Sequence, residues 1–352
     1  MEVAETLTEE LKQEAQRLGY AKLGVARVGP MEAESTRLRA WLAAGHHGTM
    51  SWMEDTEDVR CDPSDPRLLE GARSVLVMVA PYGGHAQWEG PEPGRVARYA
   101  RGRDYHNVLG KRGRKLTRWL RERGFAARAS VDSMPVFERA WAERSGVGFI
   151  GKNSCLIVPG LGSHVFLSCL ITTAELAPDS PIRAGCGDCT ACLDACPTSA
   201  FVGARQLDSR RCISYLTIEA REPSPVAIRG QMGDWLYGCD VCQDVCPYNQ
   251  GAGARSAHDP AFAPGARWEG RDTVKLLQMD EEEFREFAAG SPLRRAGRQG
   301  LARNAAIVLG NTGDRRYLPV LQHAAQHDES ESVRAVSTWA VSRLDSLSKE
   351  PT

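Results

Sequence analysis

Apolar and polar positions follow helical and strand periods in turn along the first 175 residues. Apolar residues recur at helical spacing in four segments: 6–18, 33–44, 106–123 and 135–145. Between them lie apolar runs that predict strands at 22–28, 76–79 and 125–131, and a hairpin of 155–158 with 164–172. This alternation predicts one sheet covered by helices, in an α/β or α+β arrangement.

The pattern changes twice beyond residue 175. Cysteines crowd the next stretch, and residues 251–270, rich in Gly, Ala and Pro, predict a linker or irregular crossing. Helical periodicity follows, and the segment around Arg334 echoes the one around Arg303 at the period of short helical-hairpin repeats. We therefore expect an α+β protein with an α/β domain (1–178), a cysteine-rich domain (179–250) and a linker with a HEAT-like helical module (251–352).

The cysteines stand in two runs. The first reads C-x2-C-x2-C-x3-C-P, and the second repeats its last two spacings without one cysteine, which Cys212 can replace. Structural zinc sites also use C-x2-C, but two runs that each end in Cys-Pro favour cubane iron–sulfur clusters. We assign Cys186, Cys189, Cys192 and Cys246 to one [4Fe–4S] cluster, and Cys196, Cys212, Cys239 and Cys242 to the other.

Composition supports a folded protein without a membrane span. Hydrophobic residues make up 42% of the 352 positions, and no apolar run approaches the length that crosses a bilayer. The acidic N-terminus has no apolar signal core, so we expect a cytoplasmic protein. There, the remaining cysteines Cys61, Cys155 and Cys169 are expected to be reduced and buried as small apolar residues.

Arginines gather in two stretches although the net charge is only −1. The first stretch contains Arg95, Arg98, Arg101, Arg103, Lys111, Arg112, Arg114, Lys115, Arg118, Arg121 and Arg123. The second contains Arg294, Arg295, Arg298, Arg303, Arg315 and Arg316. Guanidinium groups suit phosphate because they donate two parallel hydrogen bonds, but solvated helix faces also carry such charges. A phosphate-rich partner and a solvated surface both remain open.

Two local motifs do not fit their usual functions. Residues 146–151 match G-x-G-x-x-G, but a helix precedes them and a strand follows, which excludes a dinucleotide-binding turn. The segment 104–110 is one residue too long for the D-x-H-x-x-G loop that supplies a histidine to cobalt in some cobalamin enzymes. We therefore expect His106 to be an ordinary, partly buried histidine.

Asp132 is the main candidate for acid–base chemistry. It ends a predicted strand in Val-Asp-Ser-Met-Pro, with no adjacent cation. In an apolar site its carboxyl group could stay protonated and donate a proton near neutral pH. A helix N-cap for residues 135–145 explains the residue type equally well. The sequence leaves both interpretations open.

Taken together, these segments resemble the epoxyqueuosine reductases, cobalamin-dependent iron–sulfur enzymes that complete queuosine in tRNA. The resemblance covers nearly the whole chain and is carried by the first cysteine run and by residues 98–106, 131–139, 146–153, 211–219 and 237–247. It implies a first domain like the cobalamin-binding domains of reductive dehalogenases, followed by a ferredoxin-like domain. Base-off cobalamin would lie between the two, which agrees with the unsuitable histidine motif.

The resemblance also implies roles for single residues. Asp132 would face the substrate side of the corrin and donate a proton, and Leu156, Leu167, Ser214 and Asp240 would line the corrin. Arg221 and the arginine clusters would contact the anticodon stem-loop of the tRNA substrate.

The implied reaction reduces epoxyqueuosine to queuosine with electrons from an external donor, in a protein expected to be a monomer. Two alternatives are a reductive dehalogenase-like enzyme acting on a small molecule and an electron-transfer ferredoxin. A dehalogenase acting on a small molecule would give the basic clusters no role, and a ferredoxin would give residues 1–175 no role.

Overall fold

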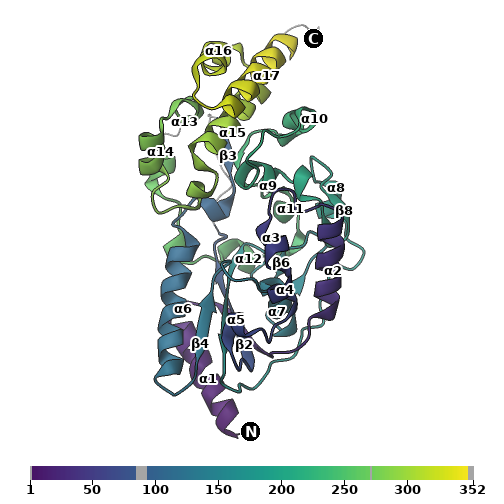
Figure 1. Ribbon diagram of the computed structural model, residues 1–352, viewed down its shortest axis with the longest axis vertical. Helices are drawn as coiled ribbons and strands as arrows, with labels where there is room; N and C mark the ends of the chain where they lie inside the picture. Colours follow the sequence, from purple (N-terminus) through teal and green to yellow (C-terminus); the bar gives the residue numbers. More distant parts are fainter. Residues whose placement is uncertain (1, 85–92, 270–271, 348–352) are drawn as a thin grey trace.

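A four-stranded antiparallel sheet forms one end of the molecule in the computed structural model, which describes residues 2–84, 93–269 and 272–347 (Figure 1). Its strands are β1 (Lys22–Arg27), β2 (Ser74–Pro81), β4 (Ala127–Ser130) and β7 (Val165–Thr172), in the order β1-β2-β7-β4. Each neighbouring pair is antiparallel. The alternation allows an α/β or an α+β domain. Because the sheet is antiparallel, the domain is α+β.

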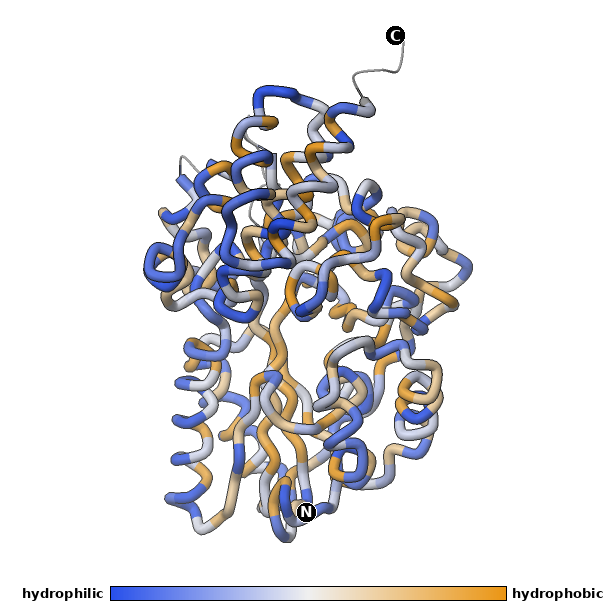
Figure 2. The backbone as a smooth tube through the Cα atoms, turned by 45° about the horizontal axis from the view of Figure 1, so that its top comes forward, coloured by the Kyte–Doolittle hydropathy of each residue, from blue (hydrophilic) through white to orange (hydrophobic). Residues whose placement is uncertain are grey.

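Helices cover both faces of the sheet because its central strands are apolar on both sides. Alternate residues of β2 point to opposite faces: Leu76 and Met78 belong to one apolar cluster, and Val75 and Val77 to the other. The first face packs against α1 (Glu2–Arg17) and α6 (Tyr105–Arg121). The second packs against α4 (Glu57–Cys61), α5 (Pro66–Leu69) and α7 (Glu138–Arg144), and Figure 2 shows the hydrophobic strands between these layers.

The predicted hairpin of 155–158 with 164–172 is wrong. Strand β6 (Leu156–Ile157) pairs instead with β5 (Phe149–Ile150) across a tight turn. Strand β7 lies between β2 and β4, where both of its faces are covered. A long apolar run such as 165–172 buries more surface in the centre of a large sheet than beside a two-residue strand.

Short elements build the cysteine-rich region (residues 179–250). They are α8 (Ala191–Asp194), β8 (Phe201–Gly203), β9 (Gln206–Leu207), α9 (Ile213–Ile218), α10 (Val226–Arg229), β10 (Trp235–Tyr237) and α11 (Val241–Asp244). Strand β10 pairs in parallel with β3 (Arg95–Val96), so a segment from the first part of the chain joins this region. The helices α2 (Glu32–Ala43) and α3 (Trp52–Asp55) complete the first part.

Helices dominate the C-terminal part, as the periodicity predicts. They are α12 (Ala252–Ser256), α13 (Thr273–Gln278), α14 (Glu281–Phe287), α15 (Gly297–Asn311), α16 (Leu318–His327) and α17 (Glu331–Leu347). Helix α15 packs between α13 and α17 and shares one apolar core with α9 and β10. Single 3-10 turns lie at Arg98–Ala100, Ser209–Arg211, Gly230–Met232, Pro247–Asn249, Pro260–Phe262, Ala266–Trp268, Pro292–Arg295 and Arg315–Tyr317.

The crossing segment before α13 is not a free linker. The Asp259 carboxylate pairs with the Arg112 guanidinium of α6, and Phe262 lies 4.7 Å from Phe166 of β7, between ring centres. These contacts hold the segment against the sheet. No helix within the described residues combines the length and the apolar composition needed to cross a bilayer.

Candidate active site and cluster region

The eight cysteines singled out by their spacing fall into two groups in space. Burial raises the pKa of Cys192, and the neighbouring Cys186, Cys246 and Cys189 raise it further. In the second group, burial raises the pKa of Cys239 to about 12, and nearby Cys212 and Cys196 add to the shift. Cys239 and Cys212 also adjoin Cys242. The two groups coincide with the two predicted sets of four.

Backbone N–H groups point at several of these sulfur atoms. The Lys152 N–H donates to Cys186 Sγ at 3.5 Å, and the Ala200 N–H donates to Cys196 Sγ at 3.3 Å. Backbone hydrogen bonds likewise oppose the rise in the pKa of Cys239 and Cys212 caused by burial. Such donors favour the thiolate, the form that binds iron, so the residues present fit two clusters.

The three remaining cysteines differ in burial. Cys169 is fully buried in the sheet core, as predicted. Cys61 and Cys155 are only half-buried, so the prediction is wrong for these two. Cys61 lies 3.8 Å from a Glu57 oxygen, at the surface end of α4. Cys155 lies instead against the thiol of Cys242, within hydrogen-bonding reach.

Asp132 lies just past the end of β4 in a left-handed backbone conformation, with φ 54°. Its side chain is exposed, and its Oδ2 accepts a hydrogen bond of 2.9 Å from the Tyr105 hydroxyl. Asp132 therefore does not lie in the apolar site that would keep its carboxyl group protonated. The N-cap alternative is wrong too, because α7 begins at Glu138 and Phe137 occupies the cap position without a side-chain hydrogen bond.

Two residues that the sequence did not single out hold the Asp132 loop. Glu138 Oε1 accepts a hydrogen bond of 2.9 Å from the Asp132 backbone N–H. Burial, and next the Asp132 carboxylate, raise the pKa of Glu138 to about 8, so this carboxyl group is protonated at neutral pH. Burial and the same carboxylate raise the pKa of Tyr105 well above its ordinary value, which keeps its hydroxyl a donor.

The residues expected to line a corrin lie in two pairs. Leu156 is buried in β6 and shares an apolar cluster with Leu167 of β7. Ser214 is two residues beyond Cys212, and Asp240 lies between Cys239 and Cys242. Asp240 is buried and accepts hydrogen bonds from the Arg98 backbone N–H (2.8 Å) and guanidinium (3.2 Å). Each pair therefore belongs to a different region of the fold.

One buried polar atom lies between these two regions without a partner. His164, just before β7, is 7% exposed, and its Nδ1 has no hydrogen-bond partner among the described residues. Burial and the nearby Arg98 and Arg101 lower its pKa to about 3, so the ring is neutral. An unsatisfied ring nitrogen at this place fits a large polar ligand, such as the amide-bearing rim of a corrin.

His106 has a partner of its own. Its Nδ1 lies 2.8 Å from Asp104 Oδ1, and this hydrogen bond raises the pKa of His106. Asp104 also caps α6 through the His106 backbone N–H. The ring is half-exposed and hydrogen-bonded to a carboxylate, as expected for an ordinary, partly buried histidine.

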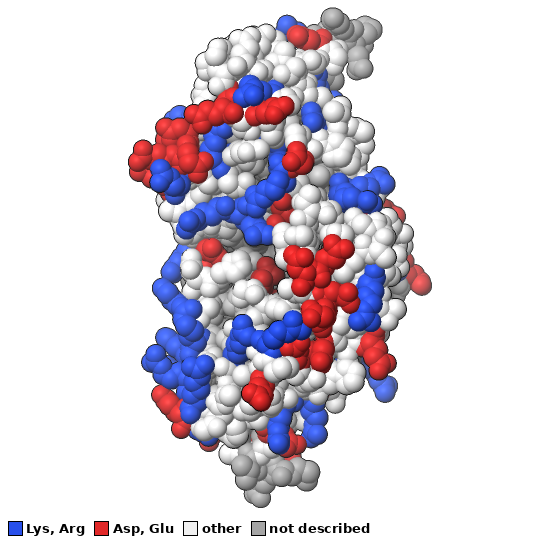
Figure 3. Space-filling view, viewed as in Figure 1, with Lys and Arg blue, Asp and Glu red and all other residues white. Residues whose placement is uncertain are grey.

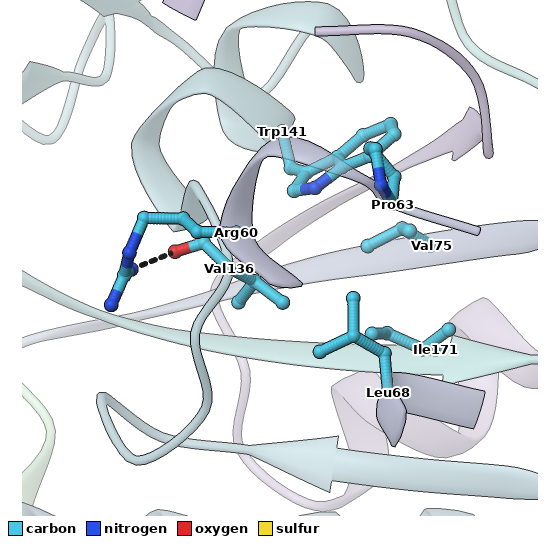
Figure 4. A pocket seen from close by; sticks show the side chains of 7 residues that line it. All are labelled: Arg60, Pro63, Leu68, Val75, Val136, Trp141 and Ile171. Atoms are coloured by element: carbon cyan, nitrogen blue, oxygen red, sulfur yellow. Dashed lines mark hydrogen bonds between the residues drawn. The ribbon is translucent and has the colours of Figure 1, made fainter. Parts of the chain in front are cut away.

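A small cavity between the sheet and α7 is too small for a substrate. It is lined by Arg60, Pro63, Leu68, Val75, Val136, Trp141 and Ile171 (Figure 4). Its volume is about 10 Å³, which is roughly the space for one water molecule. The Arg60 guanidinium beside it donates to the Val136 carbonyl at 3.0 Å. This cavity is a packing gap, and the reactive groups lie elsewhere.

The arginine clusters divide into internal and exposed members. Arg98 pairs with Asp240 and Asp244, Arg112 with Asp259, and Arg298 with Asp328, while Arg101 and Arg303 are buried. A phosphate-binding role for these five is therefore wrong. Arg95 is partly buried and pairs with Asp234. The exposed members are Arg103, Lys111, Arg114, Lys115, Arg118, Arg121, Arg123, Arg294, Arg295, Arg315 and Arg316. Figure 3 shows Lys and Arg side chains along α6 and in a row across the C-terminal helices.

Arg221 joins the second cluster in space. Its guanidinium is exposed and donates to the Arg295 carbonyl at 2.9 Å. The Arg295 guanidinium pairs with Glu219 and lies 4.7 Å from the centre of the Trp52 ring. The structure thus brings Arg221 next to Arg295, although 74 residues separate them in the chain.

The fold and the two sets of four cysteines define the class of protein, an iron–sulfur oxidoreductase. Residues 185–249 match a family model described as a 4Fe-4S double cluster binding domain. Residues 60–133 match the model described as epoxyqueuosine reductase QueG. The epoxyqueuosine reductase of Gloeobacter violaceus is 43% identical over 315 residues, which span 87% of this chain and 96% of that one. The chain belongs to the epoxyqueuosine reductase family.

Two solved structures show the same fold along the whole chain. One is an epoxyqueuosine reductase solved with an epoxyqueuosine-modified stem loop of tRNA-Tyr: TM-score 0.90, 30% identity, covering 99% of this chain and 95% of that one. The other is the Bacillus subtilis enzyme, solved with its catalytic aspartate loop swung out of the active site: TM-score 0.87, 30% identity, covering 96% and 90%.

Proposed function

We propose that this protein reduces epoxyqueuosine to queuosine in the anticodon loop of tRNA. One observation carries the proposal. A double-cluster domain and an exposed carboxylate, held by Tyr105 on a loop that Glu138 fixes through its backbone, occur in a chain that matches, over 99% of its length, a reductase solved with an epoxyqueuosine-modified stem loop. The alternative of a plain ferredoxin gives no role to the Asp132 loop.

Two sets of thiolates would hold the [4Fe–4S] clusters. Cys186, Cys189, Cys192 and Cys246 form one set, and Cys196, Cys212, Cys239 and Cys242 form the other. Base-off cobalamin would lie between Leu156 and Leu167 on one side and Ser214 and Asp240 on the other. When bound, the clusters and cobalamin would pass single electrons at low potential from an external donor to the substrate. His164 Nδ1 offers a hydrogen-bonding site for the corrin rim.

Proton supply is the task of the Asp132 loop. Converting the epoxide to an alkene and water takes up two electrons and two protons. Asp132 is exposed and can reach a substrate, while Tyr105 and Glu138 orient it from two sides. We assign the first proton to Asp132, which would protonate the epoxide oxygen. The described aspartate loop of the Bacillus subtilis enzyme supports this assignment.

The exposed arginines would bind the tRNA backbone. Arg221, Arg294 and Arg295 lie together, and α6 presents a second basic surface. Guanidinium groups bind phosphate oxygens in pairs, and such contacts position an RNA without reading its sequence. A single stem loop can be bound by one chain, so we propose a monomer.

The Asp132→Asn variant tests the proton assignment. Asparagine keeps an oxygen for the Tyr105 hydroxyl but cannot donate a carboxyl proton. We expect conversion of epoxyqueuosine in the holoenzyme to fall by about 10² or more, with iron and cobalamin contents unchanged. Glu122→Gln, at the distant end of α6, is the matched control and should keep full activity. Loss of cobalamin from Asp132→Asn would instead make the residue part of the cofactor site.

A further inference from the structure

The G-x-G-x-x-G motif that binds no dinucleotide shapes a turn between β5 and β6. A Cβ on Gly148 would lie 2.4 Å from the Ile157 carbonyl oxygen, and one on Gly151 would lie 2.6 Å from the Ile157 side chain. Only glycine allows the two strands to approach so closely at these positions. The motif thereby fixes the path of residues 151–155, and this turn reaches the cysteine-rich region.

The first half of the turn contacts one set of thiols. The Lys152 backbone N–H donates to Cys186 Sγ at 3.5 Å. Its ammonium group donates to the Gly187 carbonyl at 2.8 Å, so the positive charge is held beside the same cysteine.

The second half contacts the other set. The Asn153 side-chain amide donates to the Cys242 carbonyl at 3.2 Å, and its oxygen accepts from the Cys155 N–H at 3.1 Å. This bridge places the Cys155 thiol against the Cys242 thiol. With Cys242 bound to iron as a thiolate, it could only accept, so the Cys155 S–H would be the donor of this pair. One five-residue turn therefore touches a proposed ligand of each cluster.

Two further hydrogen bonds hold the turn in place, one from α7 and one from the cysteine-rich region. The Arg139 guanidinium donates to the Ser154 carbonyl at 2.5 Å, and the Arg205 N–H donates to the Lys152 carbonyl at 2.9 Å. Ser154 adopts a left-handed conformation, with φ 64°. A turn that is fixed in this way presents its donors to the sulfur atoms at a set distance.

Hydrogen bonds and positive charge near cluster sulfurs stabilise the reduced, more negative cluster and raise its reduction potential. We propose that the 151–155 turn raises the reduction potentials of both clusters. Cys155 raises the potential of the cluster bound by Cys242, and Lys152 raises the potential of the cluster bound by Cys186. This inference rests on the ligand sets proposed above. Each residue acts through a ligand and is a positioning residue, since neither binds iron.

A redox titration of the cluster-loaded protein, followed by electron paramagnetic resonance, tests the proposal without cobalamin or tRNA. For Cys155→Ala we expect one of the two one-electron waves to move to lower potential. The ratio of reduced to oxidised cluster at a fixed potential should fall about tenfold, which equals about 59 mV. Cys155→Ser keeps a donor and should stay close to the wild type. Lys152→Gln should lower the other wave, and by less, because its ammonium group is partly exposed to solvent.

The control is Cys61→Ala, which removes a half-buried thiol beside Glu57 and should leave both waves unchanged. The proposal fails if Cys155→Ala keeps its iron and both waves stay in place, or if both waves move together. It fails equally if Cys155→Ala loses iron, because Cys155 would then be a ligand. The titration measures the cluster potentials whether or not the protein reduces epoxyqueuosine. The two proposals are therefore tested separately.

Discussion

Replacing Arg303 by alanine should destabilise the protein without weakening tRNA binding directly. Arg303 belongs to the second arginine cluster in the sequence, a candidate phosphate-binding group, but the residue is 1% exposed in α15. Its guanidinium donates to four backbone carbonyls around the end of α9: Leu216 (3.2 Å), Ala220 (2.9 Å), Arg221 (3.0 Å) and Glu222 (2.8 Å). These bonds fix the segment that joins the Cys212 helix to Arg221.

The size of the effect follows from these contacts and from burial. Burial lowers the pKa of Arg303 from 12.5 to about 10, which corresponds to about 3 kcal/mol lost on burying the charge. Four hydrogen bonds from a charged donor contribute about 1.5–2 kcal/mol each and outweigh this loss. Arg303→Ala also leaves four carbonyls unpaired and a cavity. We expect a loss of about 3–5 kcal/mol in the free energy of unfolding.

Thermal unfolding of the anaerobic holoprotein, followed by circular dichroism, measures this loss. Arg303→Ala should lower Tm by about 5–10 °C. Arg334→Ala is the matched control: Arg334 stands at the echoed position in α17, is partly exposed and donates only to the carbonyls of Asp328 and Glu329. Its Tm should change by about 2 °C at most. An unchanged Tm for Arg303→Ala, together with weaker tRNA binding, would refute the structural role and restore the phosphate contact.

Three further predictions concern the clusters, the pH dependence and the tRNA surface. Cys212→Ala should lose the iron of one cluster and keep that of the other, so that iron analysis gives about half of the wild-type content. The raised pKa of Glu138 means that the folded state holds this proton more tightly than the unfolded chain, so stability should fall as pH rises from the ordinary carboxyl range towards about 8. Between pH 6 and pH 8 the wild type should lose about 1–2 kcal/mol more than Glu138→Gln, which has no such proton; equal Tm changes in both would contradict the shift. Replacing exposed Arg294 and Arg295 by glutamine should weaken stem-loop binding and lower the slope of log Kd against log salt by about 1–2, and an unchanged slope would remove them from the tRNA surface.

The grouping of the cysteines in space was the part of the candidate site that the sequence predicted best. The cysteine runs are local, because three thiols on one short loop reach one cluster whatever the rest of the fold does. Cys212 stands outside both runs, yet it adjoins Cys196 and Cys239 in space. Helical periodicity was equally local, and the predicted segment 106–123 differs from α6 by only one or two residues at each end.

Partners from distant segments were the part that the sequence could not predict. Arg98 and Arg112 look like members of a basic surface until Asp240 and Asp259, more than 140 residues away, pair with them. The environment of Asp132 depends in the same way on Tyr105, which approaches from the start of α6. Pairing of β7 with β2 and β4 instead of β6 is also a long-range choice, made by the size of the sheet core.

The central claim is that this chain reduces epoxyqueuosine with cobalamin and two clusters. The most direct measurement incubates the cluster-loaded protein anaerobically with a strong reductant and epoxyqueuosine-modified tRNA, with and without cobalamin, and reads the digested nucleosides by mass spectrometry. We predict the loss of one oxygen, giving queuosine, only when cobalamin is present. No conversion by a protein shown to contain iron and cobalamin, with the modified tRNA intact, would contradict the claim.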